Sequence, residues 1–142
     1  MEVTYGNEAD SLTSRRQAGK KQVLEVSVTA AANAGADTLL ATVTDHPCII
    51  DSIVIHADAA QTVDLTSCPV HGGAAKVIEF IPAALAVQAN LDAIDEQVAW
   101  TGAVRLAVAK TIVMVHNGTG ATALDLTVII TYHSEVNGGF LV

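Results

Sequence analysis

Residues 97–133 read QVAWTGAVRLAVAKTIVMVHNGTGATALDLTVIITYH and hold the clearest strand pattern in the chain. Apolar and polar residues alternate from Leu124 to His133, interrupted only by Ile129, which predicts a strand with one face in a core. Thr111–Val115 is apolar on both faces, so we expect protein on both of its sides. The glycine-rich stretch Asn117–Gly120 between them is typical of a turn with positive φ angles, which predicts a hairpin.

Strand patterns with turn residues between them recur along the rest of the chain. The first predicted strand directs Leu24, Val26 and Val28 inward, and the second directs Leu39, Ala41 and Val43. About eight strands in all predict an all-β fold, an antiparallel β-sandwich or jelly roll. Upstream of residue 97 the predicted strands are Gln22–Ala30, Thr38–Thr44, Cys48–Ala57, Val63–Ser67 and Ala75–Ile81.

The segment from Pro82 to Glu96 fits two structures. Ala84, Val87, Leu91 and Ile94 would form one face of a short helix, which the alanine content favours. Leu85, Val87, Ala89 and Leu91 would form one face of a strand equally well. One short helix is therefore possible in an otherwise all-β chain.

Composition divides the chain into three parts. Residues 1–22 lack apolar periodicity, which predicts an extended N-terminal arm. Residues 23–133 contain the predicted strands and form one β-sandwich, jelly-roll-like domain, and residues 134–142 form a C-terminal tail. The first residues lack the apolar core of a secretory signal, and no apolar run reaches the roughly 18 residues of a membrane span. We therefore expect synthesis in a cytoplasm and no membrane partner.

Charge is unevenly distributed along the chain. Residues 1–21 carry four cations and three acids, whereas the remainder carries three cations and twelve acids. An acidic body repels nucleic acid, so nucleic-acid binding is not expected. The four cations Arg15, Arg16, Lys20 and Lys21 instead suggest contact with an acidic partner surface. Charged residues make up only 15% of the chain and hydrophobic residues 51%, so we expect apolar surface to be buried against another chain.

The only candidate metal ligands are histidines and cysteines in the first half of the chain. They are His46, Cys48, His56, Cys68 and His71. Zinc takes such side chains, but their spacing matches no common zinc pattern, so we predict no metal and no cofactor. Two cysteines are too few for a disulfide framework, although one bridge between them remains open.

No residue pattern predicts an enzyme. Asp92, Asp95 and Glu96 could supply the two carboxyl groups of a glycosidase, but three acids in a polar connection are typical of a solvated loop. Trp100 shares a strand face with apolar residues, which predicts a core position, and Arg105 lies on the opposite face.

Residues 98–132 combine a Trp-Thr-Gly strand, an apolar strand, a glycine-rich turn and a closing strand that ends in tyrosine. This order resembles the C-terminal half of small jelly-roll proteins, in particular the head decoration or cement proteins of tailed bacteriophages. The resemblance implies a homotrimer on the capsid exterior that binds the major capsid protein and ties neighbouring capsomers together. It also implies that residues 1–22 are an arm over the shell, with Arg15, Arg16, Lys20 and Lys21 as its contacts.

Other classes of protein stay open at this stage. A carbohydrate- or receptor-binding module of a fibre or surface-adhesion system would use exposed aromatic rings, but aromatic residues make up only 4% of the chain. An oligomeric β-protein of another kind would share the low charge. A jelly-roll enzyme would use the histidines and cysteines and would contain zinc or iron. The sequence favours a structural virion protein made in the host cytoplasm.

Overall fold

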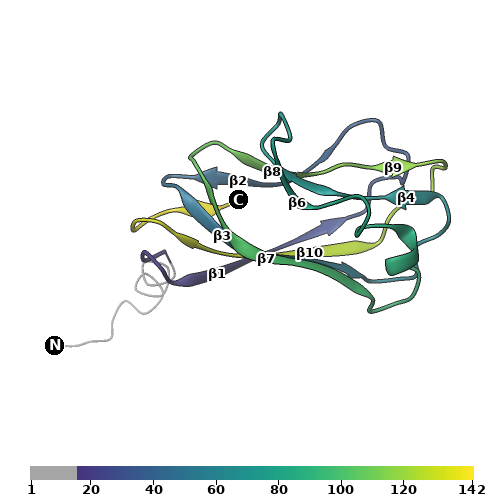
Figure 1. Cartoon of the computed structure of the whole chain (residues 1–142), viewed down its shortest axis with the longest axis horizontal. Helices are drawn as coiled ribbons and strands as arrows, with labels where there is room; N and C mark the ends of the chain where they lie inside the picture. The colour runs from purple at the N-terminus through teal and green to yellow at the C-terminus, as the bar shows by residue number, and fades with distance from the viewer. Residues whose placement is uncertain (1–15) are drawn as a thin grey trace.

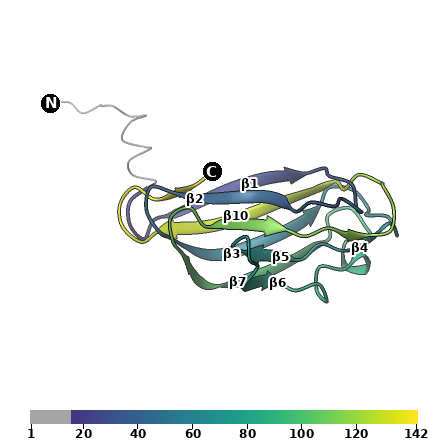
Figure 2. The same cartoon turned by 90° about the horizontal axis from the view of Figure 1, so that it is seen from above.

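A computed structural model gives the fold and describes residues 16–142. Two antiparallel sheets pack face to face (Figures 1 and 2). The strands are β1 (Lys21–Val28), β2 (Thr38–Thr44), β3 (Cys48–Ala57), β4 (Leu65–Ser67), β5 (Val70–Gly72), β6 (Ile78–Ile81), β7 (Gln97–Leu106), β8 (Thr111–Met114), β9 (Asn117–Gly118), β10 (Leu126–Ser134) and β11 (Phe140–Leu141). One 3-10 helix, η1 (Gln88–Asn90), lies between β6 and β7.

The strand order is that of a jelly roll. One sheet has the order β1-β10-β3-β7 and the other β11-β2-β8-β5-β6, while β4 and β9 form a separate pair. With β4, β9 and β11 set aside, the first strand pairs with the last, the second with the seventh, the third with the sixth and the fourth with the fifth. This nested pairing is the jelly-roll connection. The predicted antiparallel β-sandwich is confirmed.

The centre of the first sheet is β10, which lies between β1 and β3. Its side chains alternate as predicted, with Leu126, Val128 and Ile130 buried and the residues between them half-buried. The apolar strand β8 is buried on both faces, also as predicted, because Ile112, Val113 and Met114 are all buried. Each fully buried Leu, Ile or Val side chain contributes about 1.5–3 kcal/mol to folding, so these strands supply much of the core.

The start of β2 differs from the predicted alternation. Leu39 is 57% exposed, whereas Leu40 and Ala41 are both buried. The register against β8 shifts between Leu39 and Ala41, so the strand contains a β-bulge at this point. A bulge adds one residue and moves the residues before it to the other face. The prediction that Leu39 faces the core with Ala41 is therefore wrong.

The predicted hairpin between Thr111–Val115 and Leu124–His133 is also wrong. β8 pairs with β2 and β5 in one sheet, while β10 pairs with β1 and β3 in the other. The connection between them crosses the sandwich, and neither of its glycines has a positive φ. Gly118 serves a different purpose: a Cβ there would lie 2.3 Å from the carbonyl oxygen of Ala32. The glycine permits close approach of two backbones.

The middle of the chain has shorter strands than the sequence predicts. Val63 is 82% exposed, and β4 starts only at Leu65. β5 was not among the predicted strands, and β6 starts at Ile78 instead of Ala75. Residues 73–76 form the turn of the β5–β6 hairpin, where Lys76 N donates to Gly73 O at 3.0 Å.

Residues 82–96 form neither the predicted helical face nor the predicted strand face. The segment is irregular except for η1, and its buried side chains are Ala86 and Leu91. Ile94, a member of the predicted helical face, is 65% exposed. Backbone hydrogen bonds to distant parts of the same chain fix the segment instead, such as the bond from Cys68 N to Ala86 O at 2.9 Å. Alanine content favoured a helix, but tertiary contacts outweigh that weak preference.

The two ends of the described chain are tied together. Gly19 N donates to Ser134 O at 3.0 Å, and β11 extends the second sheet beside β2. The Tyr132 hydroxyl donates to Gln22 Oε1 at 3.2 Å and accepts from Leu141 N at 3.1 Å. Residues 16–22 and 134–142 therefore close the same end of the sandwich.

We predict that Gly118→Ala destabilises the fold by about 2 kcal/mol or more, because the new Cβ would overlap the Ala32 carbonyl and the backbones would have to separate. Urea unfolding monitored by circular dichroism measures the change. Gly35→Ala is the matched control, since its Cβ would meet nothing within 4 Å. Equal unfolding free energies for the two variants would contradict the close-approach role of Gly118.

Candidate functional site

Cationic side chains gather at the end of the sandwich where the described chain begins. β1 starts there while β7 and β10 end there, since Lys21 lies opposite His133 and Arg105 lies opposite Ile49. In Figure 1 this end lies on the side of the N-terminus label, away from β4 and β9. We refer to it as the basic end. Its cations are Arg16, Lys20, Lys21, Arg105 and Lys110.

Three of the four cations predicted as partner contacts lie at the basic end, and Arg15 lies outside the described residues. The Arg16 guanidinium carbon stands 3.8 Å from the ring centroid of Phe140, a cation–π contact. The Arg16 carbonyl accepts a hydrogen bond from Gly138 N at 2.8 Å, and Ala18 N donates to Asn137 Oδ1 at 2.9 Å. Residues 16–18 are therefore fixed against the C-terminal segment.

Lys21 belongs to a small ionic cluster on the outer face of the first sheet. Its Nζ lies 2.9 Å from Asp51 Oδ2, and His133 Nδ1 lies 2.9 Å from the same oxygen. Burial acts to raise the pKa of Asp51, but the hydrogen bonds from His133 and Lys21 outweigh it and lower the pKa. Asp51 thus remains a carboxylate and partly offsets the positive charge of this end.

Arg105 and Lys110 differ in their partners. Arg105 Nε lies 2.5 Å from Glu135 Oε2, and this contact raises the pKa of the guanidinium and lowers that of Glu135. Lys110 is exposed and makes no ion pair with the described residues. Lys110 is therefore the cation of this end that is most available to a partner.

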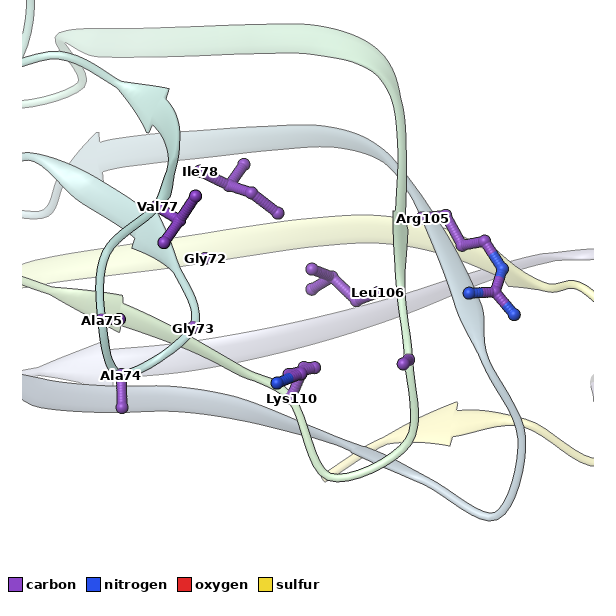
Figure 3. A pocket seen from close by; sticks show the side chains of 10 residues that line it. Gly72, Gly73, Ala74, Ala75, Val77, Ile78, Arg105, Leu106 and Lys110 are labelled. Atoms are coloured by element: carbon purple, nitrogen blue, oxygen red, sulfur yellow. The ribbon is translucent and has the colours of Figure 1, made fainter.

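A pocket of about 500 Å³ opens between the β5–β6 hairpin and the end of β7 (Figure 3). Ile78 and Leu106 point into it, and the Lys110 amine points toward the hairpin. The Arg105 side chain points away from the hairpin, consistent with its pairing to Glu135. The pocket therefore combines an apolar floor with one cation at its rim, which suits an apolar group next to a carboxylate.

Acidic side chains gather at the opposite end, near β4 and β9 in Figure 1. Three loops meet there, as shown by hydrogen bonds from Asp95 N to Ala57 O and from Thr119 N to Asp64 O, both 2.8 Å. Residues 58–64, 91–96 and 119–125 contain no lysine or arginine. We refer to this as the acidic end. Its acids are Asp58, Asp64, Asp92, Asp95, Glu96 and Asp125.

The five candidate zinc ligands do not come together. Cys48 and His56 lie near opposite ends of β3, and Cys68 precedes β5 in the other sheet. Within residues 16–142 no group of three or more His, Cys, Asp or Glu side chains could hold a metal ion. Burial raises the pKa of Cys48 to about 11 and of Cys68 to about 12, so both are neutral thiols, and they are not bridged.

One acid of the proposed glycosidase group contacts a histidine. His56 Nδ1 lies 2.8 Å from Asp58 Oδ1, and His56 Nε2 lies 3.1 Å from Asp95 Oδ1. Both ring nitrogens can donate only when the imidazole is protonated, so the two carboxylates favour the charged ring. The hydrogen bond to Asp58 raises the pKa of His56 most, against a smaller effect of burial. The contact is an ion-pair cluster of the acidic end.

The other candidate residues have structural contacts. The Glu96 carboxylate accepts a hydrogen bond from Ala93 N at 3.1 Å within its own turn. Trp100 packs on the core as predicted, with its ring edge-on to Phe80 at a centroid distance of 4.8 Å. These contacts stabilise the fold.

Comparison with known proteins adds no relative. The chain matches no known protein family, no curated protein and no solved structure. In the part of the chain that the structure describes, no helix is long and apolar enough to cross a membrane. Function is therefore inferred from the geometry and charge of this chain alone.

Sequence reasoning missed Lys110 and the gathering of the acids. Asp92 precedes β7 and Lys110 follows it. Charge counted along the sequence therefore adds the two residues together, although they lie at opposite ends of the sandwich. The pattern becomes visible only when successive loops are assigned to alternate ends of an antiparallel sandwich. Loop-by-loop charge counting on that basis would have found both ends.

We predict that His56 titrates above its ordinary value of 6.5 and that Asp58→Asn lowers this pKa more than Asp95→Asn does. Because folding raises the pKa, protonated His56 stabilises the fold below pH 6.5, and this contribution is lost as the pH rises through the folded value. NMR titration of the His56 ring protons measures the pKa. Asp64→Asn is the control, and equal pKa values in wild type and Asp58→Asn would refute the assignment.

Proposed function

We propose that this protein is a structural virion subunit that binds the outside of a phage capsid as a trimer and bridges neighbouring capsomers. The observation that supports it is the basic end, which gathers five of the six cations of residues 16–142 against the three acids Asp45, Asp51 and Glu135. An acidic shell surface would attract this end and repel the acidic end, which orients the subunit. The proposal assigns no enzymatic activity and no cofactor.

Residues 16–20, the last part of the predicted arm of residues 1–22, are held against the sandwich. Lys20 N donates to Gln17 O at 3.1 Å, and Gly19 N donates to Ser134 O, so this segment has a defined path. The predicted arm would therefore leave the sandwich at Arg16, beside the other cations. Arg15 would be its first cation beyond this point.

Apolar side chains at the basic end would supply contact area. Val108 in the β7–β8 turn is 45% exposed, and Val136 in the β10–β11 turn is 47% exposed. Protein interfaces combine such apolar groups with a polar rim that fixes orientation. The basic end has both, in loops held by a rigid sandwich.

The carbohydrate-binding alternative receives no support from the aromatic side chains of residues 16–142. Phe80 and Tyr132 are buried, Trp100 packs on Phe80, and Phe140 lies under Arg16. Sugar sites use exposed aromatic faces. We therefore develop only the virion proposal.

We predict that deletion of residues 1–15 weakens attachment to capsids of the phage that encodes the protein and leaves the melting temperature unchanged. The deletion spares Arg16, its contact with Phe140, and β1. Removal of residues 1–22 would also take the first two residues of β1, so that longer deletion is the comparison that should unfold more easily. Co-sedimentation with purified shells measures occupancy, and full occupancy after the 1–15 deletion would exclude the arm.

We predict that Lys20→Glu raises the dissociation constant for shells by roughly threefold to tenfold at low salt, because a basic-end cation becomes an acid. The difference should shrink as the ionic strength rises past about 0.1 M, where the Debye length is about 10 Å. Ala121→Glu is the control, since it adds a negative charge at an exposed position of the acidic end. An equal loss in both variants would remove the role of the basic end.

A further inference from the structure

β7 forms an open edge of the first sheet. It is ten residues long, and among the described residues it pairs only with β3 (Figure 2). Its exposed residues from Gln97 to Ala103 are uncharged, Arg105 near its end is its one exposed charge, and no proline interrupts the strand. Sheet edges of monomeric proteins are usually blocked by charges, prolines or a covering segment, because unpaired backbone groups recruit other strands. The β7 edge is therefore available for strand pairing.

The two ends of β7 carry opposite charge. Asp92, Asp95 and Glu96 precede the strand, whereas Arg105 ends it and Lys110 follows. If two β7 strands pair antiparallel, the acidic start of each lies beside the basic end of the other. Two-fold symmetry then forms this contact between acidic and basic ends twice. Parallel pairing would instead place the two acidic starts side by side and the two basic ends side by side. The charge pattern thus favours a second copy of the chain as the partner, with its β7 antiparallel to the first.

We propose that two copies of this protein associate through their β7 edges, antiparallel about a two-fold axis near Ala99–Thr101, to join their first sheets. The regular part of the strand precedes a bulge at Gly102–Ala103, where the register against β3 shifts. Two registers are compatible with this axis. In one the axis passes Ala99 and Gln97 faces the partner's Thr101, and in the other the axis passes Thr101 and Gln97 faces the partner's Arg105. Neither register opposes like charges, and the small side chains admit a second backbone.

Hollows at both ends of β7 fit this arrangement. The pocket at the basic end has Ile78 and Leu106 in its floor and Lys110 at its rim (Figure 3). Antiparallel pairing brings residues 92–96 of the partner toward it. That loop presents Ile94, 65% exposed, beside the exposed carboxylate of Asp92, so it offers an apolar group and an anion together.

The acidic end of β7 has a shallower hollow of about 440 Å³, lined by Leu85, Glu96 and Ala99 among others. The same symmetry brings the partner's Arg105 side chain toward Glu96 there. Both hollows are thus filled by the element that carries the opposite charge. A second copy fits both sites at once, which an unrelated strand would do only by coincidence.

The test is the mass of the purified full-length protein at low salt, by sedimentation equilibrium. We expect twice the chain mass of 14.6 kDa, or another even multiple if a trimer contact also forms. Ala99→Lys, which adds a charge to the edge, should raise the dissociation constant about tenfold or more. Ser27→Lys is the matched control, since Ser27 is exposed on β1 at the opposite edge of the same sheet.

Charge reversal tests the direction of pairing. Lys110→Asp and Asp92→Lys should each weaken association about tenfold, and the double variant should recover most of the loss. Circular dichroism checks that each variant is folded. A wild-type monomer or trimer would overturn the proposal, and so would an even oligomer that Ala99→Lys leaves intact. The assay contains no capsids, so its failure would leave the virion proposal standing.

Discussion

The structure depends on the pairing of β10 with β1 on one side and β3 on the other. Because the last long strand lies beside the first, residues 16–22 meet residues 134–142, and the Tyr132 hydroxyl bonds to both segments. Leu126, Val128 and Ile130 bury the inner face of β10 completely. Loss of this strand would open the core and separate the chain ends together, so the basic end exists only in the folded sandwich.

Nested antiparallel pairing also explains why charge separates along the molecule. Each long strand carries the chain from one end to the other, so consecutive loops fall at opposite ends. The loops that precede β7 and β10 lie at the acidic end, while the turn after β7 and the segment before β1 lie at the basic end. A net charge of −8 is thereby compatible with a local cationic surface. The separation of charge between the two ends follows from the strand topology as well as from the composition.

The sequence predicted the parts of the fold in which apolar and polar residues alternate, above all β10, with Ile129 as its one exception, and the inward residues of β1. It failed at Leu39, because a bulge leaves no residue signature that alternation can detect. It failed at Gly118, because the sequence does not tell a glycine that permits close backbone approach from one that adopts a positive φ. Of the site, Arg16, Lys20 and Lys21 could be found as a cluster in sequence, whereas Lys110 joins them only through the fold.

The contact surfaces are separate from the groups that hold the core together. Lys110 and Asp92 are exposed and outside the strands, whereas the buried residues of β3 and β10 are apolar. Charge at these two exposed positions can therefore change with little effect on folding. A subunit with a basic end for a shell and a β7 edge for a second copy would bind at two places at once. Two modest contacts that act together hold far more tightly than either alone, because the second forms at high local concentration. That advantage requires a rigid body between them, which the sandwich provides.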